Sequence, residues 1–260
     1  MEIPSFGIGT YKLKDDNCYN IIKKGLNMGY RLIDTAELYD NHKSISQAIN
    51  DSEIDRSQIW ITTKIHNRDQ RHLKISEAID KIKKDLNIDY IDLVLLHSPQ
   101  KTYRDAYKEL ISCKSQFNIC NIGVSNFKID ELDKIISDTN ITPFLNQIEI
   151  NPFNQRIELR KYCSDKNINV QAYSSLVCGN SLNHPDLLND YYTPVESLLN
   201  WARFYNLRPI PTMHTEEHLL ENYNILSSEL PINTDIIKSL DNISDIIINY
   251  KQHSDISKIH

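Results

Sequence analysis

Short apolar runs alternate along this chain with amphipathic segments, and this rhythm limits the folds that the chain can adopt. The runs are rich in leucine or β-branched residues and do not alternate strictly with polar residues, which is typical of parallel strands buried on both faces. Eight runs predict strands, at residues 6–10, 30–34, 59–64, 91–97, 119–125, 144–150, 168–173 and 209–211. The chain is therefore predicted to be an α/β protein with a parallel sheet.

The segments between these runs carry helical signals. Gly29 stands where the first predicted helix needs a C-cap. Residues 193–196 combine an N-cap threonine, a first-turn proline and a capping-box glutamate. From Asn242 onward the chain predicts a final helix and a loose end. Apolar residues recur at helical spacing in two further segments, at Ile75, Ala78, Ile79, Ile82 and Leu86, and at Leu132, Ile135 and Ile136.

The number of strand–helix units points to one architecture. Eight units in 260 residues have the size and rhythm of a (β/α)8 TIM barrel. We therefore expect a single domain over residues 1–260. A doubly wound open sheet is the alternative, but the chain lacks the G-x-G-x-x-G that would follow the first strand of such a sheet.

The bulk composition argues against several classes of protein. A net charge of −6 and an isoelectric point near 5.8 argue against a nucleic-acid partner and give no reason to expect a membrane surface. No apolar run approaches the roughly 18 residues of a membrane span, and the first residues do not form a signal peptide. The five cysteines are odd in number and lack C-x-x-C spacing, so we expect reduced thiols and a cytoplasmic location.

Polar residues end three consecutive predicted strands. Asp34 ends the second, Lys64 the third and His97 the fourth. Functional residues of a (β/α)8 barrel stand at these strand ends. A buried charge without a partner costs several kcal/mol, so we expect Asp34 to pair with Lys64. Three such residues at one level indicate a catalytic site, whereas one alone could be a helix cap or a satisfied core group.

A tyrosine in residues 34–41, five positions after Asp34, completes a chemical arrangement. Tyr39 is a poor acid, with an ordinary pKa of about 10, which a nearby ammonium is expected to lower. Asp34 anchors Lys64 in this interpretation, and His97 orients a carbonyl oxygen. The four residues predict a proton donor for carbonyl reduction, which also needs the hydride of a nicotinamide cofactor. The alternative is a capped turn with Tyr39 as a surface aromatic.

Motifs in a fixed order carry a resemblance to a known family. D-x-x-x-x-Y-x-N occupies residues 34–41, T-K residues 63–64, L-L-H-x-P residues 95–99 and I-G-V-S-N-F residues 122–127. N-Q-x-E follows at residues 146–149 and A-Y-S at residues 172–174. From residue 7 to about residue 222, the chain resembles the aldo-keto reductases. The resemblance implies a catalytic tetrad of Asp34, Tyr39, Lys64 and His97.

The resemblance also implies how a cofactor and a substrate bind. Ser125, Asn126 and Gln147 are expected to bind the nicotinamide carboxamide, and Tyr173, followed by Ser174, to stack on its ring. By themselves these residues also fit a turn, a strand-end polar pair and core packing. Two positions are expected to line the substrate pocket, Tyr11 and Ser98, where serine replaces a frequent tryptophan. The N-terminal hairpin of the family is expected to be absent or shortened.

The chain departs from the family where the adenosine end of the cofactor is expected. Thr212 and His218 replace the lysine and arginine that grip the 2′-phosphate of NADPH, and Met213 replaces a serine. The expected cofactor is NADPH, with NADH also possible, and Glu221 and Asn222 remain to meet the adenine. The loop after the seventh strand also loses the family's proline and glycine, which Ser175 and Val177 replace. Asn151 replaces a frequent histidine.

Three rival interpretations remain open. His214 to His218 matches the inverted zinc-protease motif H-x-x-E-H. Lys64 could form a Schiff base with a carbonyl, although a lysine paired with Asp34 stays protonated. The third rival is a catalytically weak cofactor-binding or redox-sensing barrel. Our interpretation is a monomeric NAD(P)H-dependent carbonyl reductase that binds a small-molecule substrate and no nucleic acid, membrane or metal.

Overall fold

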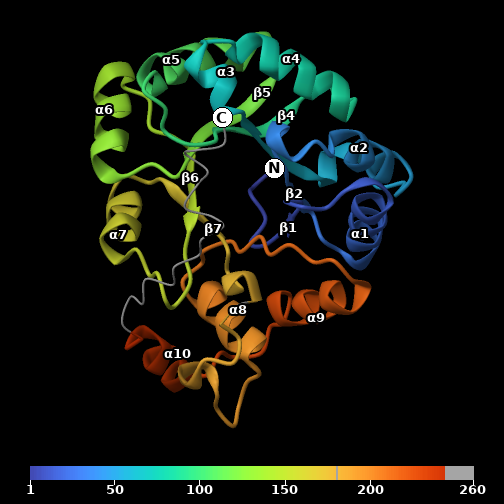
Figure 1. The fold of residues 1–260 in the computed structure, drawn as a ribbon, viewed down its shortest axis with the longest axis vertical. Helices are drawn as coiled ribbons and strands as arrows, with labels where there is room; N and C mark the ends of the chain where they lie inside the picture. The colour runs from blue at the N-terminus through green and yellow to red at the C-terminus, as the bar shows by residue number, and fades with distance from the viewer. Residues whose placement is uncertain (180, 244–260) are drawn as a thin grey trace.

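Strands and helices alternate along the chain in a computed structural model that describes residues 1–179 and 181–243 (Figure 1). The strands lie in the centre, and the helices surround them, with α3, α4 and α5 at the top of the view and α8, α9 and α10 at the bottom. The strands are β1 (Ile8–Gly9), β2 (Leu32–Asp34), β3 (Trp60–Ile65), β4 (Ile91–Leu96), β5 (Ile119–Ser125), β6 (Leu145–Glu149) and β7 (Asn169–Tyr173). The longer helices are α1 (Asp15–Met28), α2 (His42–Asn50), α3 (Asn67–Arg71), α4 (Ile75–Leu86), α5 (Tyr103–Gln116), α6 (Ile129–Thr139), α7 (Ile157–Asp165), α8 (Pro194–Phe204), α9 (Glu216–Leu226) and α10 (Thr234–Asp241). Short 3₁₀ turns are η1 (Glu37–Tyr39), η2 (Arg56–Gln58), η3 (Val177–Gly179) and η4 (Pro185–Leu187).

The sheet confirms the predicted parallel barrel. Within the described residues it has seven strands, which pair in chain order, and every pair is parallel. Asp34 lies opposite Thr62 in this register, and Ser125 lies opposite Gln147. The carboxyl ends of all strands therefore meet at one rim, where the functional residues of such barrels stand.

The eighth predicted run is not a regular strand, which corrects the expectation for residues 209–211. Pro209 and Pro211 have no N–H to donate to a ladder. Their carbonyl oxygens still accept hydrogen bonds from Gly7 N and Gly9 N in and beside β1, at 3.1 and 3.0 Å. A Cβ on Gly9 would lie 2.5 Å from the Ile210 oxygen, so only glycine permits this approach. On the β7 side, Ile210 N donates to the Ala172 oxygen at 3.2 Å, so the segment joins β7 to β1.

The helical predictions are confirmed. All five apolar positions predicted for α4 are buried. Gly29 ends α1 in the left-handed conformation, with φ of 117°. Thr193 caps α8 through a capping box with Glu196, behind Pro194 in the first turn. Many neighbouring helices pack side by side, and α9 contacts both α8 and α1.

Two layers of apolar side chains bury the sheet on both faces. The larger layer lies between the strands and helices such as α1, α2, α4 and α5. The smaller one includes Trp60 and Leu95 inside the barrel, and Ile3 packs into the same cluster. Residues 1–7 contain no strand, which agrees with the expectation of a hairpin that is absent or shortened. Ile3 covers part of the apolar interior that such a hairpin would otherwise cover.

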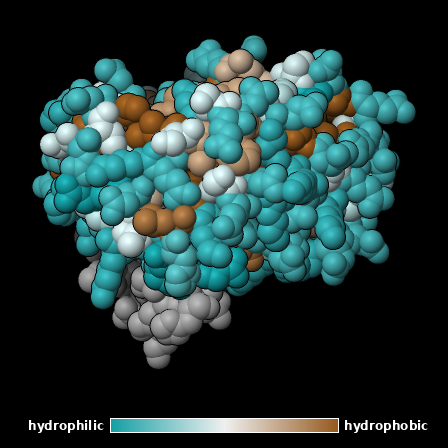
Figure 2. Space-filling model, turned by 90° about the horizontal axis from the view of Figure 1, so that it is seen from above, coloured by the Kyte–Doolittle hydropathy of each residue, from teal (hydrophilic) through white to brown (hydrophobic). Residues whose placement is uncertain are grey.

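The outer face over α3, α4 and α5 is mostly hydrophilic, with hydrophobic residues interspersed (Figure 2). Ion pairs one helical turn apart, such as Lys84 with Asp80, lie on it. None of the helices in the described ranges is long and apolar enough to cross a membrane. All five cysteines are unpaired within this part of the chain. The helix predicted from Asn242 onward falls, beyond Ile243, outside the described residues.

Candidate active site

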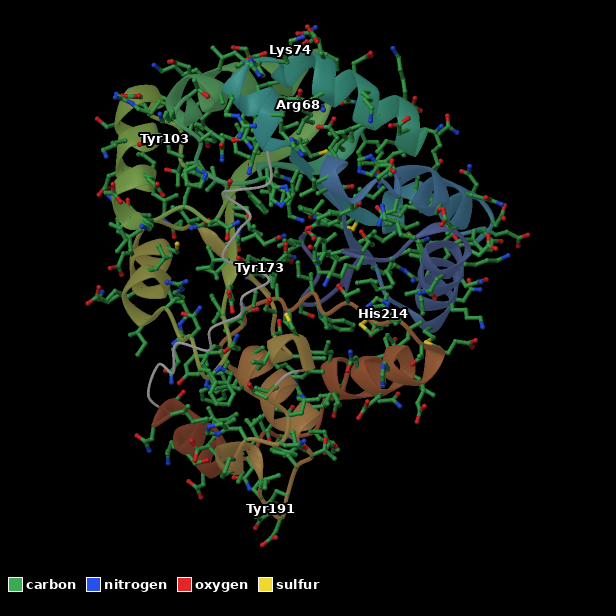
Figure 3. All side chains as sticks on the ribbon, viewed as in Figure 1. Arg68, Lys74, Tyr103, Tyr173, Tyr191 and His214 are labelled. Atoms are coloured by element: carbon green, nitrogen blue, oxygen red, sulfur yellow. The ribbon has the colours of Figure 1, made fainter. Side chains whose placement is uncertain are left out.

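The polar strand ends predicted from the sequence lie together at the carboxyl rim of the barrel. Asp34 is the last residue of β2, Lys64 is the penultimate residue of β3, and His97 directly follows β4. All three are at most 4% exposed, which for charged groups requires partners. Figure 3 shows Tyr173, which ends β7, near the centre of the ring of strands.

The Lys64 ammonium supplies that partnership. Its Nζ lies 2.5 Å from Asp34 Oδ1 and also donates to the Thr35 carbonyl at 3.0 Å and to the Tyr39 hydroxyl at 3.3 Å. These three acceptors match the three protons of an ammonium, which has no acceptor capacity of its own. Burial raises the pKa of Asp34 and lowers the pKa of Lys64, and the charge of each partner opposes the shift of the other. All three ammonium protons of Lys64 thus have an acceptor, which argues against Lys64 as a neutral nucleophile.

Tyr39 is held at the end of the η1 turn, with its hydroxyl enclosed by protein although the residue is only half-buried. Its ring lies 5.2 Å from the ring of Tyr11 and 6.0 Å from that of His97. The expectation that Lys64 lowers the Tyr39 pKa is wrong as a net effect. Burial, followed by the negative charge of Asp34, raises the pKa of Tyr39 well above its ordinary value. Tyr39 is therefore a neutral phenol at neutral pH, which is the form that donates a proton.

His97 is a neutral imidazole. Burial and then the positive charge of Lys64 lower the pKa of His97 to about 3. A neutral ring keeps one N–H donor for an oxygen at the barrel mouth without adding a second buried charge. The sequence predicted this position for His97 but not its charge state, which depends on how deeply the ring is enclosed.

A second buried histidine makes the folded state sensitive to acid. His42, at the start of α2, is 5% exposed, and burial lowers the pKa of His42 to about 4. The unfolded chain takes up a proton near its ordinary pKa of about 6.5, so stability is complete above that value and falls as the pH drops toward 4. We expect His42 alone to remove about 2 kcal/mol of unfolding free energy between about pH 7 and pH 5.

Urea unfolding of the His42→Gln variant at the two pH values checks this expectation. The variant should lose less stability on acidification than the unmodified chain, because glutamine does not titrate. His72→Gln is the matched control, since His72 is exposed. An equal loss in His42→Gln and the unmodified chain would show that the acid sensitivity comes from elsewhere.

Gln147 lies in a different environment from the one expected. Its Nε2 donates to Asp34 Oδ2 at 2.6 Å and to Gln171 Oε1 at 2.8 Å. Both carboxylate oxygens of Asp34 therefore have a partner, one from β3 and one from β6 across the barrel. Sequence reasoning missed Gln171, which shares a strand face with Tyr173 because side chains two residues apart point the same way. In the described residues, the Gln171 Nε2 has no hydrogen-bond partner.

The other residues expected at the nicotinamide end do lie together. Ser125 Oγ donates to the Gln147 carbonyl at 2.9 Å, and Asn126 Nδ2 donates to the His97 carbonyl at 3.0 Å. The Tyr173 hydroxyl donates to Asn126 Oδ1 at 2.7 Å, which fixes the aromatic ring beside this group. The ends of β4, β5, β6 and β7 thus form one connected polar surface next to the tetrad.

The segment expected at the adenosine end lies between the eighth run and α9. Thr212 is half-buried, Met213 is buried in the core, and His218 and Glu221 are exposed. Asn222 is 2% exposed, and its Nδ2 lacks a hydrogen-bond partner among the residues described. Lys24 of α1 forms an ion pair with Glu216 at the start of α9. Because Met213 faces the core, it offers no polar contact to a phosphate.

The expected pocket residues lie on either side of Tyr39 and His97. Tyr11 packs its ring against Tyr39. Ser98 follows His97 and is buried in a polar network, because its Oγ donates to Asn67 Oδ1 and accepts from Gln100 Nε2, each at 2.9 Å. This part of the rim is therefore made of hydroxyl and amide groups.

The possible zinc motif gains no support from the geometry. His214 and His218 are both exposed, and His214 lies just before α9, away from Tyr173 (Figure 3). Residues 1–179 and 181–243 contain no group of three or more His, Cys, Asp or Glu side chains that could hold a metal ion.

Comparison with known proteins assigns the chain to a family. The sequence model of the aldo/keto reductase family matches residues 5–196. This chain belongs to the aldo/keto reductase family. Membership makes this aldo/keto reductase an oxidoreductase that acts on carbonyl groups, with a nicotinamide cofactor, as the motifs predicted.

Relatives and solved structures agree with this assignment. The aldo/keto reductase is 33% identical to glyoxal reductase of Bacillus subtilis, over 88% of this chain and 86% of the relative. It is also 33% identical to methylglyoxal reductase DkgA of Escherichia coli, over 86% and 84% of the two chains. An aldo/keto reductase structure from Brucella melitensis matches with a TM-score of 0.86 and 32% identity, covering 93% of this chain and 95% of the other. An aldose reductase structure from Schistosoma japonicum matches with a TM-score of 0.89 and 25% identity, covering 97% and 92%.

The loop after β7 shows how this aldo/keto reductase tolerates the loss of a family glycine. Val177 occupies that position with φ of 54°, and Cys178 follows with φ of 51°. A β-branched residue rarely adopts this left-handed conformation. Burial of the Val177 side chain and the hydrogen bond from Val177 N to the Ser174 oxygen, at 2.9 Å, hold the turn. The loop therefore keeps a left-handed turn without glycine.

Proposed function

We propose that this chain is an NAD(P)H-dependent reductase of aldehydes and ketones in which Tyr39 supplies the proton. The observation that carries the proposal is the Lys64 ammonium, which is hydrogen-bonded to Asp34, the Thr35 carbonyl and the Tyr39 hydroxyl at once. A bound nicotinamide supplies a hydride at its C4. The protein supplies the acid and the groups that orient the carbonyl.

Each member of the tetrad has a distinct part in the proposed mechanism. The carbonyl oxygen accepts hydrogen bonds from the neutral imidazole of His97 and from the Tyr39 hydroxyl. Tyr39 Oη then gives its proton to that oxygen, and the phenolate left behind is stabilised by the Lys64 ammonium 3.3 Å away. Lys64 acts mainly on the charged form, because the pKa of Tyr39 in the resting protein is high. Asp34, held by Gln147 from the opposite side, keeps the ammonium in place.

The residues present fit a nicotinamide dinucleotide. Ser125, Asn126 and Tyr173 form a polar surface with an aromatic ring beside Tyr39, which suits a nicotinamide amide and its ring. At the other end, the buried Asn222 amide retains an unused donor, which suits an adenine nitrogen. Gln147 can bind the nicotinamide carboxamide only if its amide gives up or shares its hydrogen bond to Asp34.

We further propose that the protein uses NADH as well as NADPH. Thr212 and His218 carry no permanent charge, and the Lys24 ammonium is already paired with Glu216. A 2′-phosphate would therefore meet little positive charge. We expect Thr212→Lys combined with His218→Arg to raise NADPH affinity about tenfold or more, while NADH affinity stays nearly unchanged, because charge-assisted hydrogen bonds to the phosphate are added.

Fluorescence titration with each cofactor measures this change. His214→Arg is the control, because it adds a charge at a nearby exposed position outside the two replaced sites. An equal gain for NADH and NADPH in the double variant would contradict a specific phosphate contact.

The proposed substrates are small carbonyl compounds. The relatives named glyoxal reductase and methylglyoxal reductase make these two dicarbonyls the first to assay. The hydroxyl and amide rim around Ser98 supports a small polar substrate. We propose a monomer without a nucleic-acid partner, on the acidic net charge of −6. We also propose a cytoplasmic location, on the five unpaired cysteines.

A two-step assay tests the proposed function. NADPH and NADH are first titrated by fluorescence quenching, and methylglyoxal turnover is then followed with the cofactor that binds more tightly. We expect binding of at least one cofactor and its oxidation only when the aldehyde is present. Absence of binding by both would contradict the proposal, and binding without turnover would favour a cofactor-sensing protein.

A further inference from the structure

A nearly buried carboxyl lies on the same turn as the catalytic tyrosine. Glu37 begins η1, and Tyr39 ends it. The Glu37 side chain is 7% exposed, and a carboxyl that is this enclosed requires compensating partners. None of the proposed catalytic steps uses Glu37, so its burial needs another explanation.

The partners of Glu37 are His66, which connects β3 to α3, and two residues of α3 itself. The His66 backbone N–H donates to Glu37 Oε2 at 3.3 Å. Arg68 Nη2 lies 3.6 Å from Glu37 Oε1. The Arg68 guanidinium also donates to Asp69, from Nε to Oδ1 at 3.1 Å and from Nη2 to Oδ2 at 2.9 Å. The Asp69 carboxyl also faces the Glu37 carboxyl, and a hydrogen bond between two carboxyl groups needs one of them to be protonated. Figure 3 shows Arg68 on the α3 side of the barrel mouth.

Of the two carboxyls, Glu37 is the one whose surroundings favour the protonated form. Burial and then the charge of Asp69 raise the pKa of Glu37. Burial also acts on Asp69, but the hydrogen bond and charge of Arg68 outweigh it and lower the pKa of Asp69. The other charged or titratable groups facing this pair are His66 on the same connection and Lys81 of α4. Below the Glu37 pKa the pair is a carboxylic acid donating to a carboxylate.

The contact joins two segments that carry the catalytic pair. Glu37 is two residues before Tyr39, and His66 is two residues after Lys64. From the other side of the turn, Lys14 Nζ donates to the Tyr39 carbonyl oxygen. The η1 turn is thus fastened on both sides of Tyr39, whose Oη lies 3.3 Å from Lys64 Nζ.

We propose that Glu37 is a positioning residue for Tyr39. Through its hydrogen bonds to Asp69 and the His66 N–H, Glu37 fastens the η1 turn to the β3–α3 connection. This attachment makes proton donation by Tyr39 dependent on pH. This inference rests on the proposed function. When rising pH removes the proton from Glu37, two carboxylates face each other. Their repulsion weakens the attachment, and Tyr39 moves away from its position beside Lys64.

Two substitutions at Glu37 separate the effect of its attachment from the effect of its titratable proton. Glu37→Ala removes the attachment, and we expect kcat to fall about 10- to 100-fold, because small displacements of a reacting group cost this much. Glu37→Gln keeps an acceptor for His66 N–H and a donor for Asp69 without a titratable proton. We expect the unmodified enzyme to lose kcat as the pH rises through the Glu37 pKa. We expect Glu37→Gln to retain most of its kcat at neutral pH and to lack this loss.

Hydrogen–deuterium exchange gives a readout that does not depend on turnover. The amides of Tyr39 and Asp40 donate within the turn, to the Ala36 and Glu37 carbonyls. We expect Glu37→Ala to speed exchange in residues 34–41, and Glu37→Gln to leave it near the unmodified rate. Glu77→Ala and Glu77→Gln are the matched controls, because the Glu77 side chain on α4 is 73% exposed and lies outside the site.

The outcomes distinguish this inference from the proposed function. The inference would be overturned if Glu37→Ala had the kcat of the unmodified enzyme. It would also be overturned if kcat of Glu37→Gln fell with rising pH as it does in the unmodified enzyme. If the unmodified chain reduces no carbonyl, the proposed function fails. Hydrogen–deuterium exchange alone then shows whether Glu37 fastens the η1 turn. Faster exchange confined to residues 34–41 in Glu37→Ala would then support it, and unchanged exchange would overturn it.

Discussion

Replacing Tyr39 with phenylalanine is expected to lower kcat for aldehyde reduction by about 10²- to 10⁴-fold, the usual contribution of a general acid. Phenylalanine keeps the ring that packs 5.2 Å from Tyr11 and 6.0 Å from His97, so the pocket wall remains. It removes the hydroxyl that accepts the Lys64 hydrogen bond and that gives its proton to the substrate. Cofactor affinity should remain close to that of the unmodified enzyme.

Steady-state kinetics with methylglyoxal and fluorescence titration of the cofactor measure the two effects separately. Tyr191→Phe is the matched control, because Tyr191 is 73% exposed and lies far from Tyr173 (Figure 3). It should leave both quantities unchanged. Full turnover in Tyr39→Phe would remove Tyr39 from the mechanism, whereas loss of cofactor binding would assign it a different role.

Replacing Lys64 with methionine is expected to cost both stability and activity. Asp34 is 3% exposed, and without the ammonium its carboxylate keeps only the Gln147 hydrogen bond. Removing one partner of a buried ion pair destabilises a protein by about 3–5 kcal/mol. Activity should also be lost, because nothing then stabilises the Tyr39 phenolate. Urea unfolding and the same turnover assay measure the two losses.

The double variant Lys64→Met with Asp34→Asn separates stability from chemistry. A neutral amide at position 34 no longer needs a cation, and it can still accept the hydrogen bond from Gln147. We expect the double variant to recover most of the lost unfolding free energy while remaining inactive. If the single variant unfolds at the same urea concentration as the unmodified chain, Lys64 and Asp34 do not form a buried ion pair in solution.

Local sequence patterns predicted the barrel and the position of the tetrad residues at the carboxyl ends of its strands. Apolar runs followed by Asp34, Lys64 and His97 indicate strand ends, and a parallel barrel brings all such ends to one rim. The same reasoning was wrong for residues 209–211, because Pro209 and Pro211 remove ladder donors although the segment still closes the barrel. Periodicity shows which residues are extended but not which backbone groups pair.

Contacts across the barrel could not be predicted from the sequence. Gln147 reaches Asp34 from a strand 113 residues further along the chain, and this contact exists only because the sheet closes. Nothing in the local sequence distinguishes Glu37, because its partners His66 and Arg68 lie about 30 residues further along the chain. The direction of the Tyr39 pKa shift also depends on burial, which raises this pKa and which the sequence does not show.

Transfer of deuterium from C4-deuterated cofactor to methylglyoxal tests the central claim most directly. The enzyme is incubated with the 4,4-dideuterated reduced form of whichever nicotinamide cofactor binds, and the product alcohol is analysed by mass spectrometry and NMR. We expect one deuterium on the carbon that was the carbonyl in the unmodified enzyme, and almost no product in Tyr39→Phe. Product without deuterium, or deuterated product formed equally fast by Tyr39→Phe, would contradict hydride transfer assisted by Tyr39.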